Sequence, residues 1–350
     1  MVKKNAIVFA DGLYNCANGK TAHGLVRYSK RFKISCVVDS TLEEDDAGLI
    51  LDGIKRNIPL LNNLDKALRL TNADTFIIGA VSEGGMLPKG YDKAVEWALL
   101  NGLDIVSGLH YFISDDSHFV KLSKEKKCNI IDVRKIFRDH KRFYTGEIKN
   151  VKSLKIAILG TDSAIGKRTL AVLLDEELKK RGKKSDMIFT GQTGWLQGWR
   201  HGIIIDAMIN DFVSGGIEGA IIDSWNENHP DYIIIEGQGS LVHPFFPGGF
   251  EILAAGKVDG FILVDAPKRN HLDGFPGYPM PDTRRVVRIA ELLTEKPLIG
   301  IGINKENMID KDIEISKKKL SNMFNVPVVE PFSDGVGKLA DSLVDFNEKR

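Results

Sequence analysis

A glycine-bounded segment that contains a lysine offers the clearest chemistry in this chain. It runs Gly160-Thr-Asp-Ser-Ala-Ile-Gly-Lys-Arg-Thr169 and follows a short apolar run, residues 156–159. A buried strand, a glycine-rich loop and a helix start form a phosphate-binding pattern, because loop and helix N–H groups point at an anion. Lys167 supplies positive charge for the distal phosphates. The predicted phosphate-binding residues are Gly160, Thr161, Asp162, Ser163, Ala164, Ile165, Gly166, Lys167, Arg168 and Thr169.

The segment departs from the usual P-loop at two places. Five residues rather than four separate its glycines, and Arg168 stands between Lys167 and Thr169. Since one residue turns a helix by about 100°, the Thr169 hydroxyl is displaced from the usual Mg²⁺ position. We expect phosphate binding, with Thr169 and Glu236 as metal ligands only if Mg²⁺ is used. The alternative is a glycine-rich turn that binds nothing.

A second motif, Glu236-Gly-Gln-Gly-Ser240, follows the apolar run of residues 232–235. Open α/β sheets bind ligands at the carboxyl ends of their strands, which places Glu236 at the ligand edge. Gly237 and Gly239 permit a tight loop beside phosphates. We predict that Glu236 and Lys167 act in catalysis and that Gln238 and Ser240 bind substrate. A capped strand end followed by an ordinary turn remains the alternative.

Other polar residues could bind a small substrate. Gln192 and Thr193 follow another predicted strand and suit the orientation of an amide, a carboxylate or a phosphate. Asp206 and Asp211 could bind an ammonium group, or could be helix caps or surface acids.

Two histidines are candidates for a general base. His243 has an ordinary pKa of about 6.5, which suits proton removal near neutral pH. His110, which follows a glycine at the end of a predicted strand, is the second candidate.

The two glycine-rich motifs, residues 160–167 and 236–240, are similar to those of dethiobiotin synthetase. The whole chain resembles a two-domain family, formerly a domain of unknown function, that includes D-glutamate N-acetyltransferases. This resemblance also covers residues 190–194, Asp206, residues 211–213 and residues 241–244. It implies an acyltransferase that takes acetyl-CoA as donor and the amine of an acidic amino acid as acceptor, with the donor phosphates on the P-loop.

Two other functions stay open. One is an ATP- and Mg²⁺-dependent enzyme that activates a carboxylate, as dethiobiotin synthetase does. The other is a non-catalytic switch that responds to a bound nucleotide.

The elements that must position these residues alternate between strand and helix. In the N-terminal part, strands are predicted at residues 6–10, 34–38, 75–80 and 104–107. In the C-terminal part they are predicted at residues 155–159, 187–190, 232–236, 261–265, 298–303 and 326–329. This alternation predicts an α/β protein, because helices cover both faces of parallel sheets. We expect a Rossmann-like parallel sheet over residues 1–148 and a P-loop NTPase-type α/β/α sandwich over residues 149–350, joined by a linker near residues 141–155.

Composition limits the partners. The 350 residues carry a net charge of +1, which gives no strong field toward nucleic acid or membrane. Three scattered cysteines do not form a disulfide framework or a zinc site. No apolar run approaches the ~18 residues of a membrane span. We therefore expect a cytoplasmic homo-oligomer that acts on a small molecule.

Overall fold

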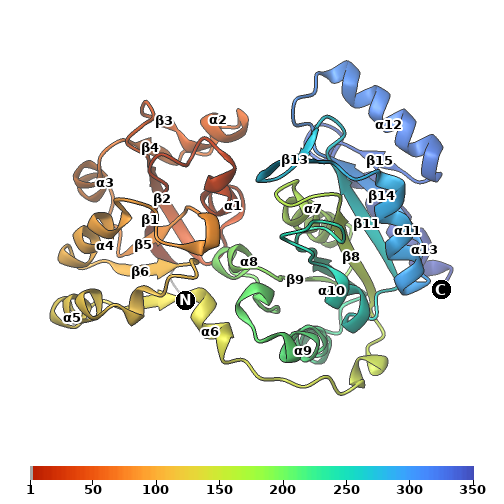
Figure 1. The fold of residues 1–350 in the computed structure, drawn as a ribbon, viewed down its shortest axis with the longest axis horizontal. Helices are drawn as coiled ribbons and strands as arrows, with labels where there is room; N and C mark the ends of the chain where they lie inside the picture. The colour runs from red at the N-terminus through yellow and green to blue at the C-terminus, as the bar shows by residue number, and fades with distance from the viewer. Residues whose placement is uncertain (1–2) are drawn as a thin grey trace. The chain divides into compact units, whose positions relative to one another are not determined.

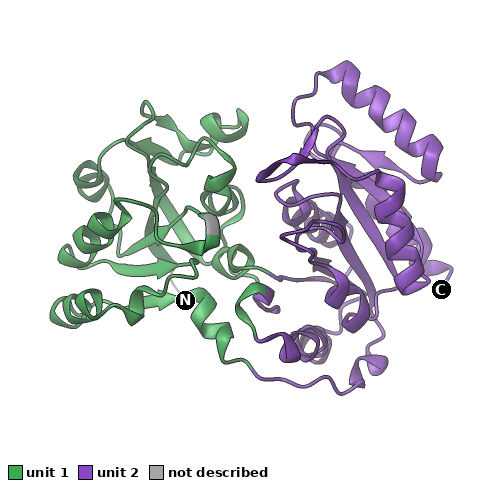
Figure 2. Cartoon of the chain, in the orientation of Figure 1, with its two compact units in different colours: residues 1–140, 191–199, 206–208 green, residues 141–190, 200–205, 209–350 purple. Residues whose placement is uncertain are grey.

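The computed structural model describes residues 3–350 as two α/β units (Figures 1 and 2). Unit 1 extends to His140 and also contains residues 191–199 and 206–208, and unit 2 contains the remaining residues from Lys141 to Arg350. Two short segments from the P-loop half of the sequence therefore belong to unit 1.

Unit 1 is built on a seven-stranded sheet in the order β3-β4-β2-β1-β5-β6-β7. All neighbouring strands are parallel except β3 and β4. Without the edge strand β3, this is the order of a dinucleotide-binding fold, whose switch point lies between β1 and β5. The strands are β1 (Lys4–Phe9), β2 (Phe32–Val38), β3 (Asp45–Asp46), β4 (Pro59–Leu61), β5 (Thr75–Ile78), β6 (Asp104–Ser107) and β7 (Ile130–Asp132). The predicted Rossmann-like sheet is confirmed.

Apolar side chains of these strands form the core of unit 1. Ile7, Phe76 and Ile105 are fully buried at its centre. The helices that surround the sheet are α1 (Lys20–Tyr28), α2 (Ala47–Asp52), α3 (Leu64–Leu70), α4 (Tyr91–Leu100), α5 (Ser117–Lys126), α6 (Val133–Arg138) and α8 (Gln192–Gln197). Gly24 of α1 allows close packing of α8, because a Cβ there would lie 2.7 Å from Thr193 Cγ2.

Unit 2 contains a six-stranded parallel sheet in the order β15-β14-β11-β8-β10-β9. The strands are β8 (Leu154–Gly160), β9 (Ser185–Ile188), β10 (Tyr232–Glu236), β11 (Gly260–Asp265), β14 (Leu298–Ile303) and β15 (Val328–Val329). Every residue of β8, β10, β11 and β14 is buried, as in a sheet covered on both faces. The helices are α7 (Lys167–Lys180), α9 (Asn210–Asn228), α10 (Phe250–Ala255), α11 (Thr283–Thr294), α12 (Asp310–Phe324) and α13 (Gly337–Glu348). The predicted P-loop sandwich is confirmed.

The segment that the sequence indicates as a linker packs on α9. A Cβ at Gly215 would lie 2.0 Å from the carbonyl oxygen of Arg142, so the glycines of α9 make room for this segment. The Glu218 carboxylate accepts hydrogen bonds from the backbone N–H groups of Thr145 and Ile148. These contacts explain why a helix rich in glycine is stable over its full length.

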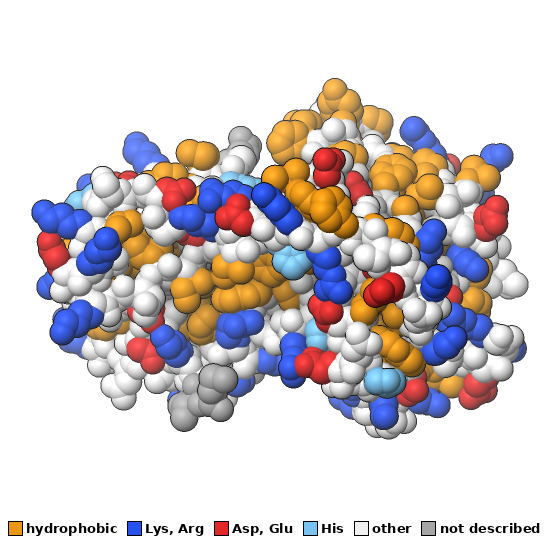
Figure 3. All heavy atoms as spheres, turned by 90° about the horizontal axis from the view of Figure 1, so that it is seen from below, with side chains coloured by type: hydrophobic (Ala, Val, Ile, Leu, Met, Phe, Trp, Pro, Cys, Tyr) orange, Lys and Arg blue, Asp and Glu red, His pale blue; other side chains and the backbone are white. Residues whose placement is uncertain are grey.

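Basic and acidic side chains are interspersed over the face shown in Figure 3, in keeping with the small net charge. Within residues 3–350, no helix is long and apolar enough to cross a membrane. In that same part of the chain, no group of three or more His, Cys, Asp or Glu side chains is arranged to hold a metal ion.

Candidate active site

The predicted phosphate loop connects β8 to α7 in unit 2. Gly160 ends β8, Lys167 begins α7, and the loop between them passes through left-handed conformations at Ala164 (φ 51°) and Gly166 (φ 102°). A Cβ at Gly160 would lie 2.8 Å from Ile165 Cδ1, so only glycine fits there without movement. The structure thus has the strand–loop–helix arrangement that an anion site of this kind requires.

Lys167 is directed into this loop. Its side chain is 7% exposed, and its Nζ donates a hydrogen bond to the carbonyl oxygen of Asp162 at 2.6 Å. The ammonium group therefore lies among the loop residues, where it could contact a phosphate.

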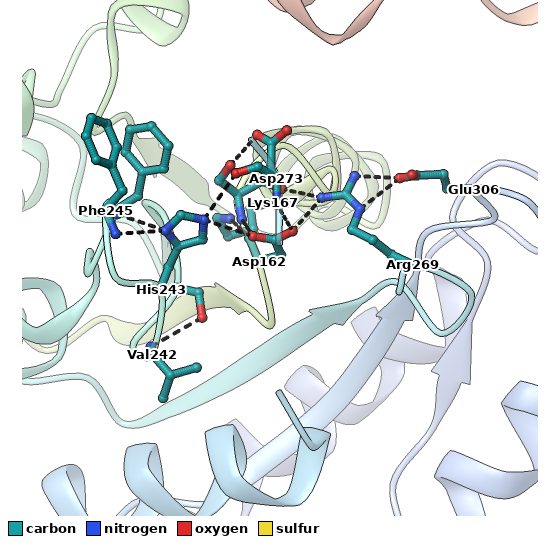
Figure 4. A network of polar contacts seen from close by, with 11 residues as sticks. Asp162, Lys167, Val242, His243, Phe245, Arg269, Asp273 and Glu306 are labelled. Carbon is teal, nitrogen blue, oxygen red and sulfur yellow. Dashed lines mark hydrogen bonds and ion pairs between the residues drawn. The ribbon is translucent and has the colours of Figure 1, made fainter. Parts of the chain in front are cut away.

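Asp162 is the centre of a buried polar network (Figure 4). Its carboxylate is fully buried and accepts hydrogen bonds from Arg269 Nη1 at 2.8 Å and from the backbone N–H of Asp273 at 2.9 Å. Ser163 Oγ in turn donates to the Asp273 carboxylate. These contacts attach the hairpin of β12 (His271–Leu272) and β13 (Phe275–Pro279) to the phosphate loop. The sequence predicts no strand there, because the prolines and glycines of this segment interrupt any strand pattern.

His243 lies in the same network and is 1% exposed. Its Nδ1 accepts hydrogen bonds from the backbone N–H groups of Phe245 and Phe246, at 3.1 and 3.0 Å. Its Nε2 lies 3.5 Å from Asp162 Oδ1, so both ring nitrogens face protein atoms. In this conformation His243 supports the loop after β10, and its role as general base stays a prediction.

Glu236 ends β10 beside the phosphate loop, as predicted, and is 1% exposed. Its Oε1 lies 2.7 Å from Arg168 Nε, and its Oε2 accepts a hydrogen bond from the backbone N–H of Thr190 at 3.1 Å. The Nε–H of Arg168 is not directed at the carboxylate, so this contact is an ion pair without a good hydrogen bond. The arginine that replaces the usual hydroxyl residue therefore neutralises the acid predicted to hold Mg²⁺.

The other predicted residues near Glu236 have local partners. Gln238 Nε2 donates to Thr190 Oγ1 at 3.0 Å. Ser240 is buried, and its backbone N–H donates to the carbonyl oxygen of Phe246. Thr169 lies half-buried in the first turn of α7.

Gly237 is one of the two tightest points of the loop after β10, with Gly239. A Cβ at Gly237 would lie 1.9 Å from the carbonyl oxygen of Ile158 in β8. We expect Gly237→Ala to lower the free energy of unfolding by about 3 kcal/mol, because backbone cannot move aside as a side chain can. Urea unfolding followed by circular dichroism measures this. Gly277→Ala, which meets no atom within 4 Å, is the matched control and should have no measurable effect. Equal stability of the two variants would contradict this description of the loop.

Of the four predicted substrate residues between positions 192 and 211, three lie in unit 1 and one does not. Gln192 and Thr193 are on α8, and Asp206 is on the short turn Ile205–Ala207. Asp211 lies in the first turn of α9 in unit 2, where it is exposed. Arg134, which the sequence analysis missed, donates to both Gln192 and Asp206. No local motif marks Arg134, because its partners lie 58 and 72 residues away.

A third polar cluster lies beside the edge strand β9. His201 is 8% exposed, and its two ring nitrogens each lie 2.6 Å from a carboxylate oxygen, one of Asp186 and one of Glu227. Burial opposes the charged ring, but the hydrogen bonds and charges of the two carboxylates outweigh it and raise the pKa of His201. The imidazolium thus bridges two acids and fixes residues 200–205 to α9.

This cluster gives a pH-dependent contribution to stability. The folded pKa of His201 lies above its ordinary value of 6.5, so the contribution is complete below pH 6.5 and is lost as pH rises through the folded pKa. The pKa of Asp186 is lowered, so that acid stays ionised throughout this range. We expect the melting temperature of the wild type to fall above pH 6.5 and that of His201→Gln to fall less. Thermal melts from pH 6 to pH 9 test this, and parallel profiles would contradict it.

Together these features define a two-unit α/β protein in which a Rossmann-like domain accompanies a P-loop domain with a variant phosphate loop. Residues 142–340 match the family described as "Domain of unknown function (DUF1611_C) P-loop domain", and residues 40–136 match its "Rossmann-like domain". The chain belongs to the DUF1611 family.

Named relatives and a solved structure extend this comparison. A D-glutamate N-acetyltransferase from Pseudoalteromonas sp is 34% identical, over 77% of this chain and 81% of its own. Another, from Tritonibacter scottomollicae, is 29% identical, over 84% of this chain and 88% of its own. The crystal structure of a DUF1611 family protein from Anabaena variabilis has 25% identity and a TM-score of 0.90, and the match covers 98% of this chain and 100% of that one.

Proposed function

We propose that this protein transfers the acetyl group of acetyl-CoA to the amine of an acidic amino acid, D-glutamate. The names of the two relatives support this reaction. The structural observation that carries the proposal is the ion pair between Arg168 and Glu236, because it favours a donor whose phosphates need no catalytic Mg²⁺. The Arg168 guanidinium already pairs with the Glu236 carboxylate, which a metal ion would need as a ligand.

The residues of the phosphate loop fit an anionic group. The loop leads into the N-terminus of α7, which favours negative charge. Lys167 adds a full positive charge. Two acidic side chains nearby are paired with arginines, Asp162 with Arg269 and Glu236 with Arg168, which reduces their repulsion of a phosphate.

The chemistry needs an unprotonated amine. The chain must remove one proton from the ammonium group of the amino acid, after which the nitrogen attacks the thioester carbonyl carbon. A C–N bond forms, the C–S bond breaks, and the sulfur leaves as a thiolate that takes up the second proton lost by the nitrogen. Acetyl-CoA supplies the activated acetyl group in this reaction.

The direct test is release of free thiol from acetyl-CoA by purified protein with D-glutamate, with the acetylated product identified by mass spectrometry. We expect turnover that EDTA does not reduce. Absence of thiol release with any acidic amino acid would reject the proposal. Substrate-dependent ADP formation that EDTA abolishes would instead favour an ATP-dependent carboxylate-activating enzyme.

A further inference from the structure

Arg134 is a buried cation at the carboxyl edge of the unit 1 sheet. It is the second residue of α6, which begins directly after β7, and it is 7% exposed. Its Nε and Nη2 donate to the two carboxylate oxygens of Asp206 at 3.0 and 2.7 Å, and Nη2 also donates to Gln192 Oε1 at 3.1 Å. Among the described side chains, hydrogen bonds to Arg134 involve its Nε and Nη2, and none involves its Nη1. One side of the guanidinium fork is therefore fixed, while the other can still bind a carboxylate.

Asp206 is more accessible than the arginine that it binds. Its side chain is 48% exposed, although that of Arg134 is only 8% exposed. Burial opposes ionisation of Asp206, but the hydrogen bonds and charge of Arg134 outweigh it and lower the pKa of the carboxyl group. An exposed, ionised carboxylate of this kind can bind an ammonium group.

His110 lies beside this carboxylate, with its Nε2 3.8 Å from Asp206 Oδ2. Burial and then the charge of Arg134 lower the pKa of His110, so its ring is neutral near pH 7 and can accept a proton. Close packing holds the ring in place, because a Cβ at Gly85 would lie 2.4 Å from His110 Cδ2. Gln192 packs as closely on Gly108, where a Cβ would lie 2.8 Å from Gln192 Cγ.

These groups complement an amino acid with a negative side chain. We propose that unit 1 binds the acyl acceptor, an inference that rests on the proposed function. Arg134 binds a carboxylate of the amino acid, Asp206 binds its ammonium group, and His110 acts as the base. The proton moves from the ammonium nitrogen to His110 Nε2, which leaves the lone pair of the amine for attack. Gln192 orients the guanidinium and does not touch the reacting atoms.

The test compares variants in steady-state kinetics and in binding. We expect Arg134→Gln to raise the KM for D-glutamate on the order of 100-fold, because a charge-assisted contact is lost. Arg134→Lys should show a smaller rise, since lysine keeps the charge but not the fork. Lys135→Gln is the matched control: its side chain bonds Ser114 and Asp115 outside this cluster, and its KM should be unchanged. Calorimetric titration with acetyl-CoA should give a Kd within twofold of wild type for all three.

Two further variants separate recognition from folding. Asp206→Asn is isosteric and should also raise the KM for D-glutamate. His110→Asn should lower kcat and remove the acidic limb of the pH profile of kcat/KM. Unchanged KM in both Arg134→Gln and Asp206→Asn, with intact acetyl-CoA binding, would overturn the proposal.

A binding measurement without acetyl-CoA tests this inference separately from the proposed function. If the wild type does not acetylate D-glutamate, the proposed function fails. Titration with D-glutamate alone still tests whether unit 1 has a binding site for this amino acid. Binding to the wild type that Arg134→Gln abolishes supports the site. Absence of binding to the wild type, or equal binding to both proteins, overturns it.

Discussion

Arg269→Ala is expected to lower the free energy of unfolding by about 3–5 kcal/mol. Asp162 is fully buried, and Arg269 is its cationic partner at 2.8 Å. Without the guanidinium, the buried Asp162 carboxylate keeps its backbone N–H donors but loses its direct cationic partner. Loss of one partner of a buried pair is costly for this reason. Urea unfolding followed by circular dichroism measures the change.

Glu306→Gln is the matched control for this prediction. Glu306 bonds the same guanidinium from its outer side, and its own side chain is 38% exposed. Solvent screens this contact, so we expect a loss below about 1 kcal/mol. Similar losses in Arg269→Ala and Glu306→Gln would show that Asp162 does not depend on Arg269.

The central parts of both units can be predicted because their signals are local. The P-loop pattern places a strand, a loop and a helix within fourteen consecutive residues, 156–169, and Glu236 follows an apolar strand directly. The carboxyl ends of parallel strands meet at one edge of a sheet, which brings the two motifs together. Such local signals can be recognised in the sequence without knowledge of distant contacts.

The contacts that complete the sites could not be predicted in this way. Arg269 pairs with Asp162 across 107 residues, and Arg134 pairs with Asp206 across 72. No spacing rule connects such residues. The helix α8 has six residues and contains Gly194, so no helical period is visible, and its place in unit 1 follows from packing on α1 and α6. The glycines of α9 likewise interrupt its helical pattern.

Lys167→Ala is expected to weaken acetyl-CoA binding by about 100-fold, which corresponds to about 2.7 kcal/mol. The mutation removes the positive charge directed into the phosphate loop, together with its hydrogen bond to the Asp162 carbonyl oxygen. Lys180→Ala, at the exposed C-terminal end of the same helix, is the control and should bind as the wild type does. Circular dichroism of each variant shows that a loss of binding is not a loss of fold.

The most direct test of acyl-donor binding at the P-loop is calorimetric titration of the wild type and Lys167→Ala. Each protein is titrated with acetyl-CoA in EDTA, and separately with ATP and Mg²⁺. We predict that the wild type binds acetyl-CoA without a metal and that Lys167→Ala loses this binding. Binding of ATP with Mg²⁺ alone, or acetyl-CoA binding that the mutation leaves unchanged, would contradict the assignment of the P-loop to the acyl donor.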